Sequence, residues 1–496
     1  MENKQDKFSS IGYVAAALGM CIGTGNVWRF PRICAANGGG AFIVAWTVAM
    51  LIYAVPLLSA EMAIGKRTRL GCVGAFRDTS GKKTTWLGFF VAFVCFGLMS
   101  YYSVVQAYCA KYMVSSLFTF QPNMDTATTE ALWTAFTDSS WQVILFHFLC
   151  MGTGCYVVYK GISGGIEKFC KVMIPALFLI LLGLAVYAMT LDGATAGLQY
   201  LFTIDTSYLF SSNTWIQAFI QAAWSTGAGW GFIITYANYV DAKEDIPNNC
   251  LLMGIGDNLG ALLAGFVVIP SICALSPTAQ AASEALGSGN YGLTFIYVYQ
   301  LFSTIPGGRV ISFIFFFLLT MAALTSLFSM IEVGAKMLMD LGFSRHKAVL
   351  VVCGAGFLLG CFSAWNLNNI DNQDWVWGIG LLVSGGLIAI AAWKFGVEKM
   401  RTEWVNAEGA IYHTPKWYFN TCIYIMPILA FGMTIWYLVQ SISWFPDTAW
   451  NPFVIQDNIG TCILQWGLVV VVGLILNKWF NRKTAMGPVT DPEDCK

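Results

Sequence analysis

The sequence predicts an all-helical integral membrane protein with twelve transmembrane helices: a five-plus-five inverted repeat in which helices one and six are broken, followed by two C-terminal helices. Three observations predict this fold class. Charged residues are too few for a water-soluble domain, apolar runs of membrane-crossing length recur along the chain, and glycine-rich interruptions occupy matching places in its two halves.

The composition indicates a protein that lives in lipid. Of its 496 residues, 57% are hydrophobic and 11% are charged, whereas soluble proteins carry about 25% charged residues. The formal net charge is zero, which argues against a nucleic-acid partner. The expected partners are therefore the lipid bilayer and a small molecule. Most of the 15 cysteines lie inside apolar runs, where we expect them to act as small buried hydrophobes.

Apolar runs long enough to cross about 30 Å of hydrocarbon recur twelve times in the chain. They lie near residues 11–35, 41–64, 86–116, 141–159, 170–190, 213–239, 249–275, 309–338, 347–364, 375–395, 417–441 and 458–478. The predicted domains are an N-terminal cytoplasmic segment (1–10), a first repeat (11–190), a second repeat (213–395), two accessory helices (417–478) and a cytoplasmic tail (479–496).

The basic residues predict the orientation. If the N-terminus is cytoplasmic, all but four of the 27 lysines and arginines fall on the cytoplasmic side; the exceptions are Arg29, Arg32, Lys111 and Arg309. Cytoplasmic loops carry the excess of basic residues, so both termini are predicted to be cytoplasmic. The chain has no N-x-S/T glycosylation acceptor and no cysteine in the loop 121–140, which favours a multi-pass protein of a prokaryotic inner membrane.

Two predicted spans contain helix breakers. The first span includes GMCIGTGNVWRFP (19–31), and the sixth reads FIQAAWSTGAGWGFIITYANYV, with glycines at 227, 229 and 231. Because five spans separate the two, a five-helix repeat would place its second copy upside down. Unwound backbone at membrane depth is tolerated where it is buried in protein or lines a cavity, and such paired breaks are typical of a transporter's central site. The alternative is that the glycines only let helices pack closely.

The motifs in these segments resemble a known family. The pattern G-x-x-x-G-x-G-N-x-W-R-F-P in span one, NGGGAF at 37–42 and the tyrosine pair at 101–102 are similar to those of the neurotransmitter:sodium symporters, in particular the bacterial amino-acid carrier branch. The resemblance implies a ten-helix inverted-repeat core, two added helices, and sodium-driven uptake by alternating access. It also implies a transporter and not an enzyme.

Two sodium sites are carried over from the family. The first is expected to use the carbonyl of Cys21 and the side chains of Asn26, Ser225 and Asp257. The second is expected to use the carbonyls of Gly19, Ile22 and Ala322 and the hydroxyls of Thr325 and Ser326. All of these ligands are oxygens, as a hard cation requires. The hydroxyls of Thr325 and Ser326 have an alternative role, since such groups in membrane helices usually bond back to their own backbone.

Asp257 departs from the family's commonest residue at this position, which is asparagine. Animal relatives place a chloride ion near this sodium, and the position that often carries the chloride-binding serine is Ala261 here. A buried carboxylate in a span is costly unless it meets a cation or a cavity. We therefore expect Asp257 to supply the negative charge and transport to need no chloride. The alternative is a protonated structural aspartate.

Gly23 points to the substrate class. Amine carriers of the family hold an aspartate at this position, whereas amino-acid carriers hold a glycine that leaves room for the substrate carboxylate. That carboxylate is expected on the N–H groups of Thr24 and Gly25 with help from Tyr102, and the ammonium near carbonyls of span one, span six and Ser326. The side-chain pocket is expected to be lined by Met20, Leu98, Trp224, Gly227, Trp230 and Met330. An uncharged pocket disfavours charged substrates, so a neutral and large hydrophobic or aromatic amino acid is expected.

The resemblance also implies gates on both sides of the site. On the outer side, Arg29 is expected to pair with Asp374, with Gln221 beside them. On the inner side, Asp340 resembles the family's cytoplasmic gate aspartate, but the usual N-terminal arginine and tryptophan are absent. Its partner is expected to be an N-terminal lysine, Lys4 or Lys7. Glu61 and Glu332, near the inner ends of spans, are interpreted as structural.

One alternative of the same fold stays open. A proton-coupled amino-acid carrier would place a basic group where the second sodium ion sits, and Thr325 and Ser326 argue against it. Three histidines are too few for two bis-histidine haems, and no phosphate-binding loop for ATP-driven pumping is present.

Overall fold

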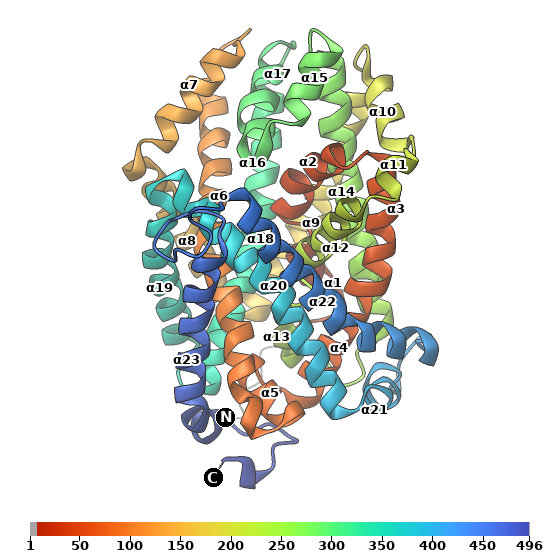
Figure 1. The fold of residues 1–496 in the computed structure, drawn as a ribbon, viewed down its shortest axis with the longest axis vertical. Helices are drawn as coiled ribbons and strands as arrows, with labels where there is room; N and C mark the ends of the chain where they lie inside the picture. Colours follow the sequence, from red (N-terminus) through yellow and green to blue (C-terminus); the bar gives the residue numbers. More distant parts are fainter. Residues whose placement is uncertain (1–6, 496) are drawn as a thin grey trace.

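Long apolar helices run between two ends of the molecule (Figure 1), which is known here from a computed structural model that describes residues 7–495. The helices of the first half are α1 (Ser10–Cys21), η1 (Gly25–Arg29), α2 (Phe30–Ala36), α3 (Gly40–Ala49), η2 (Met50–Ala54), α4 (Val55–Thr68), α5 (Cys72–Ser80), η3 (Lys82–Thr84), α6 (Thr85–Phe118), α7 (Thr126–Thr137), α8 (Ser140–Tyr159), η4 (Ile162–Glu167) and α9 (Lys168–Met189).

The chain continues with short helices and then the second half of the bundle. These elements are α10 (Ala194–Phe202), α11 (Thr206–Leu209), α12 (Ser212–Thr226), α13 (Phe232–Tyr236), η5 (Ala237–Tyr239), α14 (Ile246–Leu275), α15 (Ala279–Leu286), α16 (Gly289–Tyr291), η6 (Gly292–Val298), α17 (Tyr299–Ser303), α18 (Gly308–Asp340), α19 (Arg345–Trp365), α20 (Leu367–Phe395), α21 (Val397–Met400), η7 (Arg401–Val405), α22 (Lys416–Trp444), α23 (Ile459–Lys483) and η8 (Pro492–Cys495).

The predicted spans correspond to these helices. Within residues 7–495, ten helices are long and apolar enough to cross a membrane, and the pair α1 with η1–α2, bent by 42°, makes an eleventh span. The remaining predicted span, 213–239, is α12 and α13 separated by a non-helical stretch, and neither piece is long enough to cross by itself. The all-helical, twelve-segment architecture is therefore confirmed, including both breaks.

The polar segment before span ten is where the predicted boundary fails most clearly. Span ten was expected to begin near residue 375, but α20 begins at Leu367. The residues in between, NNIDNQD, are helical, and Asn369 and Asn372 among them are buried. A hydropathy count treats such residues as loop because it cannot see that their polar atoms face protein and not lipid.

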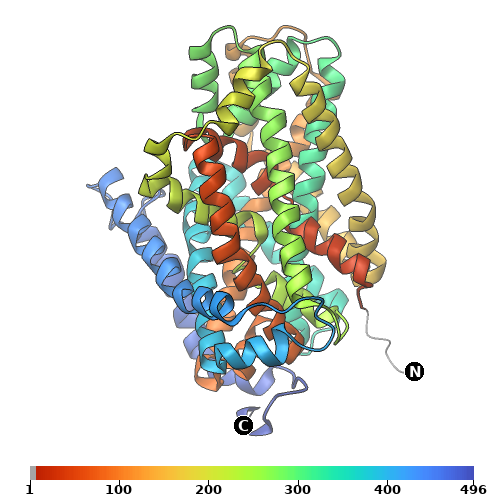
Figure 2. The same cartoon turned by 90° about the vertical axis from the view of Figure 1, so that its right-hand side faces the viewer.

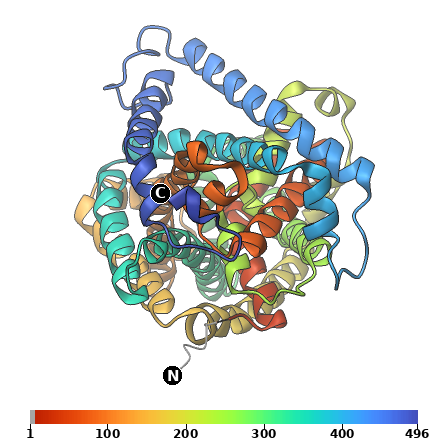
Figure 3. The same ribbon diagram turned by 90° about the horizontal axis from the view of Figure 1, so that it is seen from below.

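The two ends of the bundle differ in what covers them. α1 begins and α23 ends at the same end (Figures 1 and 3), which the basic residues predict to be cytoplasmic and which we call the inner end. At the opposite, outer end, the short helices α7, α10, α15 and α17 cover the bundle, where the sequence predicted only connecting loops. The helices α5 and α21 lie at the inner end.

Two long helices form the centre of the scaffold. α6 and α18 pack along each other more extensively than any other pair, and α8 with α19 and α9 with α14 pack beside them. α22 and α23 lie on the periphery (Figure 3), and α22 leans across the neighbouring helices (Figure 2). The broken segments are therefore enclosed by unbroken helices, which is the condition under which unwound backbone is stable at membrane depth.

Candidate functional site

The first break lies between α1 and η1. α1 ends at Cys21, and its C-cap residue Ile22 has left the helical region, with φ −83° and ψ 80°. The Gly23 N–H donates to the Cys21 carbonyl at 3.0 Å, and the Asn26 N–H donates to the Gly23 carbonyl at 3.2 Å. The chain thus turns sharply before the helix resumes at Gly25.

The second break, residues 227–231, is held open by glycines and by a buried carboxylate. Gly227, Gly229 and Gly231 have φ of 72°, 91° and 74°, a left-handed conformation that only glycine adopts without strain. Glu61 of α4 is fully buried, and its Oε1 accepts the Gly229 N–H at 2.6 Å. A methyl group on Gly229 would lie 3.0 Å from the Cα of Gly385 in α20. The sequence indicated only a structural role for Glu61, and its contact with the broken helix was missed.

The residues expected at the first sodium site come together between the two breaks and α14. The Asn26 amide donates to the Asp257 carboxylate at 2.7 Å and to its carbonyl at 3.0 Å, and both residues are fully buried. The Ser225 hydroxyl lies 2.8 Å from the other Asp257 oxygen. A buried carboxylate, amide and hydroxyl offer the oxygens that a hard cation prefers. The Cys21 carbonyl is taken by Gly23, while its thiol donates to the Thr226 carbonyl at 3.3 Å.

The residues expected at the second sodium site lie where α1 packs against α18. The Ser326 hydroxyl lies 3.1 Å from the Met20 carbonyl, 3.4 Å from the Gly19 carbonyl and 3.5 Å from the Ala322 carbonyl. The Thr325 hydroxyl donates to the Ala322 carbonyl at 2.9 Å, which is the backbone bond that a membrane-helix threonine usually makes.

Ser326 therefore bridges α1 and α18, and Thr325 stands beside it. Ile22 is fully buried, and its side chain lies against Gly260 of α14. The structure supports the proximity of the expected ligands, and their role stays a prediction.

Two hydroxyl groups lie where a side chain at Gly23 would begin. A Cβ atom there would lie 2.4 Å from the Ser326 hydroxyl and 2.8 Å from the Tyr102 hydroxyl, far closer than non-bonded atoms approach. The Thr24 N–H donates to the Tyr102 hydroxyl at 3.2 Å. Tyr102 of α6 thus lies against the unwound part of span one, as expected for the polar end of a substrate pocket. Gly25 packs closely on the backbone of Ser225.

Aromatic side chains gather at the second break. The rings of Trp224 and Trp230 meet edge to face at a centroid distance of 5.3 Å, and Trp230 lies 4.9 Å from Phe232. A Cβ on Gly227 would lie 2.8 Å from the Phe232 ring and 3.4 Å from the terminal methyl of Met20. Phe232 was missed, although its place two residues after Trp230 could have drawn attention to it. Leu98 and Met330 are buried in the surrounding core.

The outer gate is not closed in this structure. The Arg29 guanidinium donates to Gln221 Oε1 at 2.5 Å, Gln221 donates to the Gly25 carbonyl at 2.8 Å, and the Tyr101 hydroxyl donates to Asp374 at 2.7 Å. Arg29 and Asp374 line one cavity of about 190 Å³ instead of forming an ion pair within the described chain. The expected pairing is thus not observed, because each group bonds to a neutral neighbour instead. We use the term outer closure for the set of groups that would close this end, which is open here: the cavity and the side chains of Arg29, Gln221, Tyr101 and Asp374.

Further carboxylates surround the outer closure. Asp457 precedes α23, and its burial together with the charges of Asp371 and Asp374 raises its pKa to about 7. Asp371 accepts a hydrogen bond from the Tyr291 hydroxyl at 2.7 Å. The outer end therefore gathers carboxyl groups in a partly buried place, which favours the protonated form of Asp457.

In the part of the chain that the structure describes, residues 7–495, the partner of Asp340 at the inner end is Lys336 and not Lys7. Asp340 forms an ion pair with Lys336, one turn earlier in α18, and accepts the Gly71 N–H at 2.6 Å. Lys4 lies outside the described residues, and Lys7 is exposed. The prediction of Lys7 is wrong because a basic residue on the same helix face, four positions away, satisfies the carboxylate locally.

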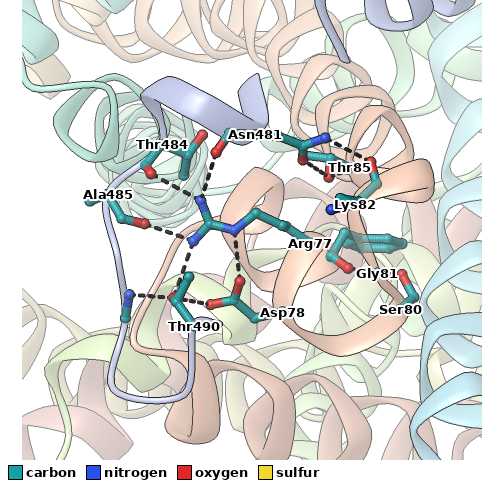
Figure 4. A network of polar contacts seen from close by, with 12 residues as sticks. Arg77, Asp78, Ser80, Gly81, Lys82, Thr85, Asn481, Thr484, Ala485 and Thr490 are labelled. Carbon is teal, nitrogen blue, oxygen red and sulfur yellow. Dashed lines mark hydrogen bonds and ion pairs between the residues drawn. The ribbon is translucent and has the colours of Figure 1, made fainter. Parts of the chain in front are cut away.

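The C-terminal segment clasps α5 at the inner end (Figure 4). Arg77 of α5 is fully buried and donates to the carbonyls of Thr484 at 2.9 Å, Ala485 at 2.8 Å and Asn481 at 3.3 Å, and to the Thr490 hydroxyl at 3.2 Å. The Ala485 N–H donates to the Asp340 carbonyl at 2.7 Å. One arginine thus joins α5, the segment after α23 and the end of α18.

A second ion pair closes the inner end beside α8. Arg345 of α19 donates to both oxygens of the fully buried Glu332, at 3.0 Å and 2.6 Å, and the Tyr239 hydroxyl donates to Glu332 at 2.6 Å. Phe8 packs edge to face on Tyr239 at 6.4 Å and on Tyr236 at 5.3 Å. We call the contacts of Asp340, Arg77 and Glu332 the inner closure.

The chain is similar to known membrane transporters in sequence and in structure. The family model described as the sodium:neurotransmitter symporter family matches residues 5–143 and 133–482. The chain is 31% identical over 414 residues to an uncharacterized sodium-dependent transporter of Methanocaldococcus jannaschii, covering 80% of this chain and 83% of that protein. It is 27% identical over 484 residues to the sodium- and chloride-dependent GABA transporter ine of Drosophila melanogaster, covering 86% of this chain and 50% of that protein.

A solved structure shares the fold. The crystal structure of MhsT in complex with L-phenylalanine aligns with a TM-score of 0.77 at 26% identity, over 87% of this chain and 99% of that chain. This similarity confirms the broken-helix, inverted-repeat architecture predicted from the paired glycine clusters.

Proposed function

The chain belongs to the sodium:neurotransmitter symporter family, and on this premise we propose that it imports a neutral amino acid together with sodium by alternating access. The single observation that carries the amino-acid assignment is the packing at Gly23. Gly23 carries no side chain and is packed against the Ser326 and Tyr102 hydroxyls, so the protein offers no carboxylate at this position to hold a substrate amine. The Thr24 N–H and the Tyr102 hydroxyl, which bond to each other at 3.2 Å, are groups that favour a substrate carboxylate instead.

A large hydrophobic or aromatic side chain is proposed for the substrate. Trp224, Trp230 and Phe232 meet beside the second break, and aromatic faces and edges stabilise aromatic and aliphatic groups. Glu61, an ionisable side chain at the second break, is already bonded to Gly229. A charged substrate would lose its hydration there without gaining a partner. The structural relative MhsT was crystallised in complex with L-phenylalanine, an amino acid of the proposed class.

We propose that two sodium ions bind and that transport does not require chloride. An ion between Asn26, Ser225 and Asp257 would meet the carboxylate of Asp257, which in the present structure is bonded to two neutral side chains, those of Asn26 and Ser225. The second ion would lie between the carbonyls of α1 and the Thr325 and Ser326 hydroxyls. Binding of either ion draws the broken α1 onto α14 or α18, which couples ion binding to the position of the inner half of span one.

The proposed orientation places both termini in the cytoplasm of a cell whose inner membrane holds the protein. The basic residues support it. In this orientation, the open cavity at Arg29 faces outward and the inner closure separates the site from the cytoplasm, so the structure corresponds to a carrier ready to receive substrate from outside.

Uptake into proteoliposomes tests the proposal. We expect uptake of labelled phenylalanine or leucine driven by an inward sodium gradient, little uptake of glutamate or lysine, and no loss when chloride is replaced by gluconate. Substitution of potassium for sodium should abolish it. Uptake that persists without sodium and follows a proton gradient would establish the proton-coupled alternative, and a strong chloride requirement would remove the role given to Asp257.

The variant Asp257→Asn sharpens the chloride question. It preserves the size of the side chain and one oxygen that can accept from Asn26, but it turns the other oxygen, which accepts from Ser225, into an N–H donor and removes the charge. We expect sodium affinity to fall by roughly tenfold or more, since a full charge at a buried cation site is worth at least about 1.4 kcal/mol. If added chloride partly restores the sodium affinity of this variant, the loss is due to the missing charge and not to a change in the shape of the site. An unchanged sodium dependence would contradict the assignment.

A further inference from the structure

A groove lies on the lipid-facing surface at the inner end of α8 and the start of α9. Its volume is about 640 Å³, and the residues that matter here are Tyr156, Lys160, Gly164, Lys168, Phe169 and Val172. Tyr156 and Val172 are 63% and 67% exposed. Gly161, with φ 98°, lets the chain reverse between the two helices, so that a lysine from each helix faces one groove.

The two lysines of the groove have no carboxylate partner in the part of the chain that the structure describes. The Lys160 ammonium lies 5.2 Å from the centre of the Tyr156 ring, and Lys168 is exposed at the first position of α9. The nearest acid, Glu167, is already bonded to Lys171 at 2.5 Å and to the Ser9 hydroxyl at 2.7 Å. Two ammonium groups therefore face one groove without an internal counter-charge.

The floor of the groove is apolar and continues toward the middle of the membrane. Phe169 and Val172 follow Lys168 on the first turns of α9, and at about 1.5 Å per residue they lie roughly 2–6 Å deeper. A methyl group on Gly164 would meet no atom within 4 Å, so the mouth of the groove has space for a headgroup. Cations at the surface above an apolar channel complement an anionic lipid and not a soluble peptide.

We propose that this groove binds an anionic phospholipid of the leaflet at the inner end. The phosphate lies between the Lys160 and Lys168 ammonium groups, and one acyl chain lies along Phe169 and Val172. Tyr156 contacts the glycerol region, as aromatic residues do at membrane interfaces.

The lipid is placed to act on the broken helix. η4, which forms one side of the groove, is tied to the start of α1 because Glu167 accepts both the Ser9 N–H at 3.1 Å and the Ser9 hydroxyl at 2.7 Å. A Cβ on Gly12 would lie 2.2 Å from the Glu167 carboxyl carbon, so α1 and η4 are in close contact. A lipid that orders η4 therefore favours the position of α1 seen here. This consequence rests on the proposed function, whereas the lipid binding does not.

Native mass spectrometry of the full-length protein in detergent tests the binding. Phosphatidylglycerol and phosphatidylcholine of the same acyl chains are titrated against the wild type, against the double variant Lys160→Gln/Lys168→Gln, and against the control Lys394→Gln/Lys478→Gln, whose lysines are exposed at the inner ends of α20 and α23. We expect one tight phosphatidylglycerol in the wild type and the control, and affinity reduced roughly tenfold or more in the groove variant. Equal retention of both lipids, or equal retention by groove and control variants, overturns the proposal.

Two further measurements separate the lipid from other causes. Inorganic phosphate at millimolar concentration should not displace the lipid, because the acyl chain contributes to binding; complete displacement overturns the choice of a lipid over free phosphate. Amide exchange at residues 162–167 should slow when phosphatidylglycerol is added to the wild type and not to the groove variant. If the exchange rate at residues 162–167 does not change when the lipid is added, the link between the lipid and η4 is overturned. If uptake fails equally in the groove variant and the control variant, that result contradicts the proposed function and does not affect the conclusion on lipid binding.

Discussion

The outer and inner closures use similar chemical groups with different results. At the outer end, Arg29 bonds to a neutral amide, Asp374 bonds to a tyrosine, and a cavity of about 190 Å³ separates the two charges. At the inner end, Glu332 is bonded to Arg345 at 2.6 Å, and Arg77 is paired with Asp78 at 2.7 Å while it also donates to four acceptors of the C-terminal segment. The difference is whether a charge finds its counter-charge or only a neutral neighbour.

This contrast shows how a carrier can seal one side while leaving the other accessible. Arg29 and Asp374 are only partly buried and line a cavity, so breaking their bonds to neutral neighbours costs little. A charge that is fully buried depends on its partners, since its hydration is already lost. The inner closure also draws on α5, α18, α19 and the tail, so that several elements must move together before it opens.

The largest effect is expected from breaking the buried inner ion pair. Arg345→Gln leaves the fully buried Glu332 without its cation, and such losses cost about 3–5 kcal/mol. Thermal unfolding in detergent should show a large fall in Tm. The double variant Arg345→Met/Glu332→Met removes both charges and should recover most of that loss. If the single variant is as stable as the wild type, the pair is not what closes this end.

An intermediate effect is expected from releasing the C-terminal clasp. Arg77→Gln cannot reach the carbonyls of Thr484 and Ala485 together, and we expect a loss of about 1–3 kcal/mol. Amide exchange should rise in α5 (Cys72–Ser80) and in the tail. Lys483→Gln, an exposed change in the same segment, is the control and should alter neither. Faster exchange in the tail alone would show that the clasp does not hold α5.

A smaller effect is expected at the outer end. Arg29→Gln removes one bond to Gln221 from a group that lines the cavity, so the stability should change by about 1 kcal/mol or less. The same Tm assay compares it directly with Arg345→Gln. If Arg29→Gln lowers the Tm as much as Arg345→Gln does, the two closures do not differ in their contribution to stability.

The smallest effect is a pH dependence at the outer end. The pKa of Asp457 is raised from its ordinary value to about 7 by burial and by Asp371 and Asp374. The folded chain thus keeps a proton that the unfolded chain releases between about pH 4 and 7, and stability falls as the pH rises through that window. Asp457→Asn should remove this fall, which we expect to total less than about 1 kcal/mol across the whole window because Asp457 is partly exposed and water screens its charge. Identical Tm profiles from about pH 5 to 8 would contradict the raised pKa.

Much of the architecture could be predicted because membranes impose simple rules. Hydrocarbon thickness gives the spans, and glycine clusters in a membrane segment give the breaks. The residues expected at the first sodium site do lie together at the breaks: Asn26 and Ser225 each approach Asp257 within 2.8 Å. Their assignment to sodium stays a prediction.

Contacts between segments that are far apart in the sequence were harder to predict. Neither the role of Glu61 at Gly229 nor the clasp of Arg77 on the tail has a local signal, because their partners lie 168 and more than 400 residues away. The expected pairing of Arg29 with Asp374 failed to appear for a related reason. Whether Arg29 and Asp374 meet depends on which conformation the whole bundle adopts. One sequence encodes every conformation of the transport cycle, so it cannot indicate which one a given structure shows.

The sequence by itself determined that this protein crosses a membrane many times and which of its helices are broken. Its motifs also determined the family to which the chain belongs. These properties follow from local hydrophobicity, glycine placement and short motifs, since the bilayer acts on each segment separately. Only the tertiary structure decided which charges are satisfied, which end is sealed, and where two lysines from separate helices share a groove. Those properties depend on side chains from separate helices meeting in space, and no single segment encodes them.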